Sequence, residues 1–187
     1  MKCKGCKQTF PKPSSSFVCW CSPDCGLKVW RAREARERAK QARAEAQELR
    51  KRKEAAKPRA QWMREAQTAF NAWIRARDAG QPCISCRREH TGQNHAGHYL
   101  STGARPELRF NETNCHLQCQ PCNVHLHGSL VLYRIMLIQK IGLYQVEWLE
   151  GPHTPKKYTI DELRIIRDDY RARLKVCPGA GVSGAVS

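Results

Sequence analysis

The longest uninterrupted pattern in the chain is a polar one, and it predicts a helix over residues 28–57. This stretch consists almost entirely of Ala, Arg, Glu, Lys and Gln, which are good helix formers, and no Gly or Pro interrupts it before Pro58. The few larger apolar side chains are Val29, Trp30 and Leu49. Because an apolar stripe is almost absent, we expect an exposed helix supported by i,i+4 ion pairs such as Glu34–Arg38.

An apolar period of helical spacing follows Pro58 and predicts a second helix from about Gln61 to Asp78. Gly80 and Pro82 should end it. The residues that share one face are Trp62, Ala66, Phe70, Trp73, Ile74 and Arg77. Aromatic side chains at this spacing are usually core residues, so this face should pack against the domain that follows.

Two further helices are predicted nearer the C-terminus. Residues 129–143 form a mainly apolar run that predicts a mostly buried helix ending near Gly142. Thr159 and Glu162 have the spacing of a capping box, which predicts a last helix over roughly 160–175. The expected fold class is therefore α+β, mostly helical.

Cysteine is abundant, with 11 residues among 187, and it gathers where aliphatic side chains are few. Residues 1–27 cannot bury enough apolar surface to fold unaided. The N-terminus has no apolar secretory region, and no run of apolar residues is long enough to span a bilayer. We therefore expect a cytoplasmic protein without membrane association, in which thiols at short spacings bind metal rather than form disulfides.

The cysteine spacings predict two structural zinc sites with four thiolate ligands each. The first comprises Cys3, Cys6, Cys21 and Cys25. Cys19 is an alternative to Cys21, although the Cys-Ser-Pro-Asp-Cys turn favours Cys21. The second comprises Cys83, Cys86, Cys119 and Cys122, two C-x2-C pairs whose joint ligation would tie together the segment between them. Cys115 and Cys177 are left as ordinary thiols.

The chain is strongly basic, with 33 Lys and Arg against 17 Asp and Glu and a formal net charge of +16. A charge of this size predicts an acidic partner, of which nucleic acid is the common one. An exposed connector and a DNA-contacting helix fit residues 28–57 equally well. The side chains there that we expect to contact DNA phosphates are Arg31, Arg33, Arg36, Arg38, Lys40, Arg43, Arg50, Lys51, Arg52 and Lys53.

Polar side chains that suit phosphodiester hydrolysis lie between and just after the two C-x2-C pairs. Hydrolysis needs a base to activate water and a cation to stabilise negative charge. A His with a pKa near neutrality suits the first task, and Mg²⁺ or Mn²⁺ suits the second. The candidates are His95, His98, Asn114, Asn123 and His127. If a helix begins near Cys122, Asn123 and His127 lie four residues apart on one face.

The pattern of Cys83/Cys86, His98, Asn114, Cys119/Cys122 and Asn123 resembles the HNH branch of the His-Me finger nucleases. Nearly the whole chain, except its Gly/Ala/Ser tail, resembles the phage lambda NinG (Rap) family. That wider resemblance rests on the N-terminal cysteines, the basic helix, Cys-Ile-Ser-Cys at 83–86, Ala-Gly-His-Tyr at 96–99, Gln-Cys-x-x-Cys-Asn at 118–123 and Leu-His-Gly at 126–128.

The HNH resemblance implies a zinc-stapled ββα core that holds one divalent metal. It implies that His98 is the base, that Asn114 orients this base or the hairpin, and that Asn123 and His127 are metal ligands. The chain departs from the pattern at Gly97, where HNH nucleases usually carry an acidic residue or His that binds metal. His95 is one replacement for that ligand, and a residue elsewhere in the chain is the other.

The NinG resemblance implies a phage recombination protein of the bacterial host cell that cuts branched DNA such as Holliday junctions and D-loops, with phage recombination proteins as further partners. We expect a zinc module at 1–27, a basic helix or linker at 28–57, an HNH-like nuclease domain with flanking helices at 58–177, and a disordered tail at 178–187. Symmetric cutting of a four-way junction needs two active sites, which predicts a homodimer on the DNA, paired through the basic helix.

Two alternatives share the same charge and the same cysteine pairs. One is a non-catalytic zinc-containing accessory protein that binds DNA junctions. The other is a protein whose zinc modules dock a partner such as a recombinase. Loss of cutting but not of binding on substitution of His98 would separate a nuclease from the first. Junction affinity that survives neutralisation of the basic helix would favour the second.

Overall fold

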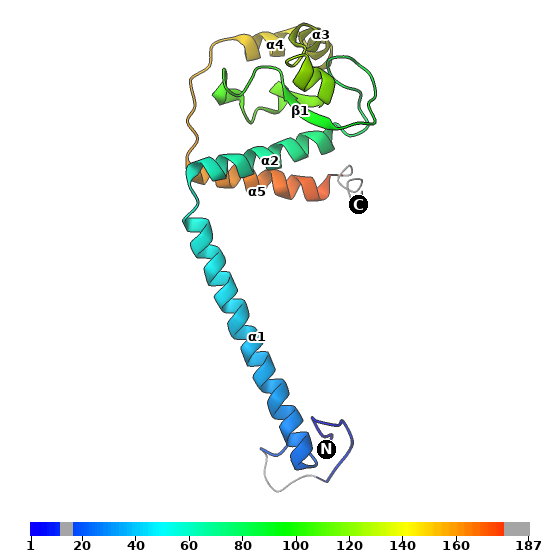
Figure 1. The fold of residues 1–187 in the computed structure, drawn as a ribbon, viewed down its shortest axis with the longest axis vertical. Coiled ribbons are helices and arrows are strands. Elements are labelled where there is room, and N and C mark those ends of the chain that lie inside the picture. The colour runs from blue at the N-terminus through cyan, green and yellow to red at the C-terminus, as the bar shows by residue number, and fades with distance from the viewer. Residues whose placement is uncertain (12–16, 178–187) are drawn as a thin grey trace. The chain divides into compact units, whose positions relative to one another are not determined.

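The computed structural model describes residues 1–11 and 17–177 and divides the chain into two units, Met1–Lys57 and Pro58–Ser187 (Figure 1). The tail predicted to be disordered, residues 178–187, lies outside the described residues. No helix in the described ranges is both long and apolar enough to cross a membrane.

The first unit is a cysteine cluster continued by one long helix, α1 (Pro23–Ala55). Ser22 caps the helix, since its side chain accepts a hydrogen bond from the backbone N–H of Cys25 at 3.3 Å. The predicted helix is thus confirmed, but it begins at Pro23, inside the segment assigned to the zinc module. Pro is well suited to the first turn of a helix, where its missing N–H costs nothing.

α1 is exposed along its length, as its polar pattern predicts. Cys25 is its one buried residue. Arg38 pairs with Glu34 at 2.7 Å and Arg52 with Glu48 at 3.3 Å, both at i,i+4 spacing. Each such exposed pair contributes about 0.3–0.5 kcal/mol, so ion pairs support this helix where apolar burial does not.

The second unit places a two-stranded antiparallel sheet between two helical layers (Figure 1). Strand β1 (Asn94–His98) pairs with β2 (Cys115–Cys119), so that His98 lies opposite Cys115 and Asn94 opposite Cys119. The helices are α2 (Arg59–Arg77), α3 (Leu130–Ile141), α4 (Leu143–Glu150) and α5 (Ile160–Val176). The shorter turns are η1 (Pro106–Leu108), η2 (Glu112–Asn114) and η3 (Pro121–His125). The described chain is therefore mostly helical with one small sheet.

Each face of the hairpin has its own apolar core. Phe70 and Trp73 of α2 pack with Tyr170 of α5 against Cys115 on one face. Tyr133 and other side chains of α3 and α4 pack on the other. The predicted packing role of the α2 face is confirmed. The capping box of Thr159 and Glu162 is also present, and α5 begins directly after it.

The apolar run at 129–143 is less buried than predicted. α3 ends at Ile141, and Gly142, with a φ of 85°, turns the chain into α4, which confirms the predicted end of the helix. Only Tyr133 and Leu137 of α3 are buried. The large exposed apolar side chains of α3 and α4 are Leu130, Val131, Leu132, Ile135, Leu143, Tyr144 and Trp148. The prediction of a mostly buried helix is wrong because a sheet of two strands can cover only one side of it.

A buried ion pair joins the end of α2 to β2. Asp78 is 2% exposed, and its Oδ2 accepts a hydrogen bond from the backbone N–H of Leu117 at 2.9 Å. Arg77 donates to both carboxylate oxygens, each at 2.8 Å. Burial acts to raise the pKa of Asp78, but hydrogen bonds from His116 and Arg77 and the charge of Arg77 hold it well below its usual range. This network fixes β2 to the helical layer below it.

Candidate metal clusters and hairpin site

Four cysteines of the first unit converge on one point. They are Cys3, Cys6, Cys21 and Cys25, and their sulfur atoms all lie within 4.8 Å of one another. The sulfur of Cys21 lies 3.6 Å from that of Cys6 and 3.7 Å from that of Cys25. A tetrahedral zinc ion with Zn–S bonds of about 2.3 Å places its sulfurs about 3.8 Å apart. The cluster can therefore hold a zinc ion, and it includes Cys21 rather than Cys19, as predicted.

The electrostatics of this cluster favour a cation. The backbone N–H of Cys6 lowers the pKa of the Cys3 thiol to about 6, which favours the thiolate that binds metal. Hydrogen bonding to the sulfur of Cys6 raises the pKa of Cys21 to about 12. Adjacent thiols repel one another when ionised, so four thiolates this close need a positive ion between them.

The second cluster comprises Cys83, Cys86, Cys119 and Cys122, with sulfur atoms again within 4.8 Å. The sulfurs of Cys86 and Cys119 are 3.9 Å apart, close to the tetrahedral spacing. This group can also hold a zinc ion. Cys119 is the last residue of β2, so the cluster ties the open end of the hairpin to the 83–86 turn.

The two clusters share one local turn although their sequences differ. In each, the residue after the second cysteine, Lys7 or Arg87, has a positive φ, 66° and 59° respectively. Its backbone N–H donates to the carbonyl of the first cysteine, Cys3 or Cys83, at 2.9 Å in both cases. The first C-x2-C pair of each cluster thus forms the same turn, whereas Cys119 and Cys122 lie at the end of β2 and in η3.

His98, the predicted base, lies at the end of β1 on the face toward α2. Its ring packs 5.9 Å from that of Phe70, and its Nε2–H donates to the carbonyl oxygen of Arg109 at 2.9 Å. Nδ1 then carries the lone pair, and it faces the sulfur of Cys115 at 3.7 Å. Burial lowers the pKa of His98 and so favours the neutral ring, the form that a general base requires.

Asn114 is buried and holds the loop between the two strands. Its Nδ2 donates to the carbonyls of Leu100 and Leu108 at 3.0 and 3.3 Å. Its Oδ1 accepts from the backbone N–H of Leu100 at 2.9 Å. These contacts agree with the second of its predicted roles, orienting the hairpin, and they make it a positioning residue.

The three predicted ligands of a catalytic metal are only partly brought together. Asn123 Nδ2 donates to His95 Nδ1 at 2.9 Å, on the opposite face of β1 from His98. In the part of the chain that the structure describes, His127 forms no hydrogen bond to either residue. Apart from the two cysteine clusters, no three Cys, His, Asp or Glu residues there present converging ligand atoms. The Mg²⁺ or Mn²⁺ site stays a prediction.

The expected helix through Asn123 and His127 is not formed. η3 is a single π-helical turn that ends at His125, and its closing bond runs from the N–H of Leu126 to the carbonyl of Pro121. His127 follows with a φ of 48°, in the left-handed region. The expectation of one shared helical face is therefore wrong, because the cysteine turn and Gly128, with a φ of 87°, end the helix early. The ββα core is not established by this arrangement.

Gly97, where an acidic residue or His was expected, faces the side chain of Gln118. A Cβ atom at Gly97 would overlap Gln118 Oε1 and lie 2.9 Å from Gln118 Cβ. Gln118 is fully buried, and its Nε2 donates to Ser85 Oγ and to the carbonyl of Gly128, both at 2.7 Å. The space that a ligand at position 97 would need is thus filled.

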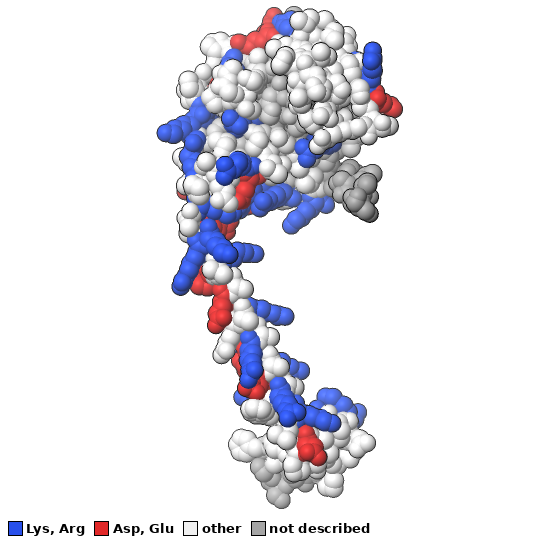
Figure 2. Space-filling view, viewed as in Figure 1, with Lys and Arg blue, Asp and Glu red and all other residues white. Residues whose placement is uncertain are grey.

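The basic residues predicted to contact DNA all lie on α1 and are exposed. Figure 2 shows Lys and Arg along this helix with acidic side chains between them. At about 100° per residue, the sequence positions of the basic residues distribute them around the helix rather than along one stripe.

Three buried polar residues that hold the hairpin in place, namely Asp78, His116 and Gln118, were not predicted from the sequence. They are buried polar groups that act through contacts with residues distant in the sequence. The one available signal was a charged pair, Arg77–Asp78, at the end of an apolar helical face.

Comparison with known proteins places the chain in a family. The sequence profile described as Bacteriophage Lambda NinG protein matches residues 1–178. The chain belongs to the NinG family. Protein ninG of Salmonella phage P22 is 43% identical, with 93% of this chain and 92% of that protein covered. The ninG proteins of Escherichia phages lambda and 933W are also 43% identical, with 93% of this chain and 91% and 92% of theirs covered. No solved structure matches the chain significantly.

Proposed function

We propose that this NinG-family protein is a structure-specific DNA endonuclease that cuts branched recombination intermediates, such as Holliday junctions and D-loops, in the phage-infected bacterial cell. One observation carries the proposal. His98 lies at the end of a cysteine-clamped hairpin, and its Nε2–H is committed to the Arg109 carbonyl, so the neutral ring keeps a lone pair on Nδ1. A neutral ring with a lone pair on one nitrogen is the protonation state that a general base needs.

In the proposed reaction, His98 Nδ1 takes a proton from a water molecule whose oxygen attacks the phosphorus. The P–O bond to the leaving sugar oxygen then breaks, that oxygen takes a proton from a solvent water, and His98 releases its proton to solvent. The water has to approach beside the Cys115 thiol, which Nδ1 faces. Asn114 keeps the hairpin loop, and with it the Arg109 carbonyl, in place.

We include a divalent cation, Mg²⁺ or Mn²⁺, in the proposal because negative charge on the phosphate and the leaving oxygen must be stabilised. His95 and Asn123 do not fit the role of its ligands beside His98, because they lie on the opposite face of β1. The basic residues of α1 would hold DNA phosphates without reading sequence, which suits recognition of shape. A homodimer, and contacts with other phage recombination proteins, complete the proposal.

The alternative is an accessory protein that binds junctions without cutting them. It is favoured by the position of Cys115 against His98 Nδ1 and by the small number of metal ligands near His95. The same clusters and charge would serve it equally well.

The test uses the full chain with zinc bound, a labelled four-way junction and a linear duplex of the same sequence. We expect cuts near the branch point with Mg²⁺ or Mn²⁺, none with a chelator that spares the zinc clusters, and none with His98→Ala. His125→Ala, an exposed histidine of η3, is the matched control and should cut normally. Tight binding without cuts in any protein would establish the accessory alternative.

A further inference from the structure

A basic pocket of about 460 Å³ lies on the second unit. It is formed where three segments meet: the first turns of α2, the η1 turn within the hairpin loop, and the extended stretch before α5. Its lining includes five cationic side chains, Arg59, Arg64, Arg109, Lys156 and Lys157. No acidic side chain lines it.

Most of these cations are not neutralised by the protein. Lys156 pairs with Glu162 at 3.1 Å. Within the described residues, the other four have no carboxylate partner. Arg59 donates to the backbone carbonyl of Tyr158 at 2.7 Å, and Arg109 donates to Gln67 and to the carbonyl of Thr102, both at 3.2 Å. These neutral contacts orient the guanidinium groups and leave their charge unbalanced.

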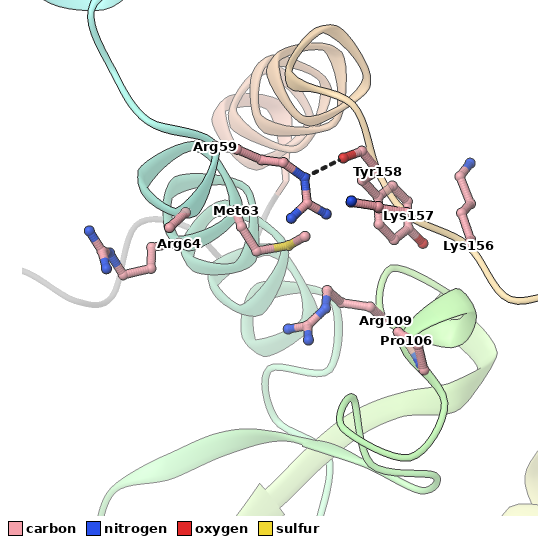
Figure 3. A pocket seen from close by; sticks show the side chains of 9 residues that line it. Arg59, Met63, Arg64, Pro106, Arg109, Lys156, Lys157 and Tyr158 are labelled. Carbon is pink, nitrogen blue, oxygen red and sulfur yellow. Dashed lines mark hydrogen bonds between the residues drawn. The ribbon is translucent and has the colours of Figure 1, made fainter.

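Three of the cationic side chains, Arg59, Arg109 and Lys157, point into one space (Figure 3). Those of Arg59 and Lys157 point toward the region beside Met63, and Arg109 enters it from the hairpin loop. The side chain of Arg64 points away from this space. Like charges gathered in this way repel one another, so the pocket favours an anion with several charges.

The pocket is also linked to His98, the candidate base, through a residue that contacts both, Arg109. The carbonyl of Arg109 accepts the hydrogen bond from His98 Nε2, while the guanidinium of the same residue lines the pocket. Ala60, Met63 and Pro106 give it an apolar wall. Alternating anionic and apolar surface is the chemistry of a sugar–phosphate backbone.

We propose that this pocket binds the phosphodiester backbone of the DNA strand that leads to His98. The proposal rests on the proposed function for the direction of the strand but not for its binding. Recognition is by charge, with the guanidinium and ammonium groups contacting phosphate oxygens and the apolar wall contacting sugars. No base is read, because the ring of Tyr158 is buried under Lys156 and Phe110.

The first test is the salt dependence of binding to a duplex and to a four-way junction, measured by fluorescence anisotropy with the zinc-loaded full chain. Each phosphate contact contributes about 0.9 to the slope of log K against log salt concentration. Lys157→Gln should therefore make the slope shallower by about 0.9. The control Lys175→Gln removes the same charge from an exposed position of α5 and should leave the slope unchanged.

The second test blocks the pocket without changing its charge. Ala60 is exposed and lines the pocket, so Ala60→Trp should weaken DNA binding severalfold while the fold is kept. Ala172→Trp, at an exposed position of α5, is the control and should have no effect. Equal losses in the pocket and control variants, or no loss in the pocket variants, would overturn the proposal.

Cleavage, measured on the same samples, separates this inference from the proposed function. If no protein cuts DNA but the pocket variants lose affinity, the pocket stands and the nuclease proposal fails. If the unmodified chain cuts the junction and the pocket variants bind and cut equally well, the pocket proposal fails alone.

Discussion

Introducing a side chain at position 97 should lower the free energy of unfolding of the second unit. In Gly97→Ala, the added Cβ overlaps Gln118 Oε1 and lies 2.9 Å from Gln118 Cβ and 3.0 Å from its Cδ. The first contact is with the end of a side chain, which could move if it were free. The second is with an atom attached directly to the β2 backbone, which cannot move without shifting the strand.

Gln118 is not free to move. It is fully buried, and its amide nitrogen is held by Ser85 and by the carbonyl of Gly128. Overpacking of this kind costs about 1–3 kcal/mol. Its Oε1 has no hydrogen-bond partner within the described residues, so Gln118→Ala removes a cost as well as two hydrogen bonds. Gln118→Ala keeps the Cβ atom, so the double variant Gly97→Ala/Gln118→Ala should recover only the part of this cost that comes from Oε1 and Cδ, about 1 kcal/mol relative to the sum of the single changes.

The assay is urea denaturation of the zinc-loaded full chain, followed by tryptophan fluorescence, for the four proteins of this cycle. A cost below about 0.5 kcal/mol for Gly97→Ala, or additive effects in the double variant, would refute the packing argument. The cycle also bears on the site. If the overlap is real, Gly97→Asp cannot recreate the acidic residue of the HNH pattern without a shift of β2, because even Gln118→Ala would leave a Cβ atom 2.9 Å from the new one.

Three further predictions follow from the clusters and the buried charges. Gly5→Ala should release zinc from the first cluster, because the new Cβ would lie 2.7 Å from Cys25 Cβ, and metal analysis should fall from two ions per chain toward one; two retained ions would contradict this. Asp78→Ala should lower the free energy of unfolding by about 3 kcal/mol because it leaves a cation partly buried without its partner, whereas Asp161→Ala in an exposed pair should cost less than about 1 kcal/mol in the same urea titration; equal costs would be inconsistent with a buried pair. The cleavage rate should reach half its maximum below about pH 6.5, the ordinary pKa of His, because burial lowers the pKa of His98 and the neutral ring is the base, so a half-maximum well above that pH would exclude His98 from that role.

The features that could be predicted from the sequence are those set by local rules. α2 and α5 follow from apolar period and capping, and the two cysteine clusters follow from C-x2-C spacing together with the Cys21–Cys25 turn. Each of these depends on residues a few positions apart, for which the sequence pattern is a direct record of the geometry.

The geometry of the candidate site was harder to predict from the sequence, because it depends mainly on contacts between residues that are far apart in the chain. The position of His98 against Phe70 is set by which face of β1 meets α2. The left-handed conformation of His127 is set by the bond from the N–H of Gly128 to the carbonyl of Cys122, at 2.9 Å. The basic pocket is lined by three segments, and the second and third end about fifty and about a hundred residues after Arg59. No local sequence pattern therefore predicts it.

The cysteine clusters explain how so small a sheet can carry a site at all. An isolated hairpin of two five-residue strands is marginal in water, and here its open end is closed by Cys119 and the 83–86 turn rather than by further strands. Metal at this cluster would therefore supply part of the free energy of folding. It follows that His98, Asn114 and Arg109 keep their mutual positions only while the cluster is intact. Removal of zinc should abolish both DNA-pocket binding and any cleavage together, whereas removal of Mg²⁺ or Mn²⁺ should affect cleavage alone.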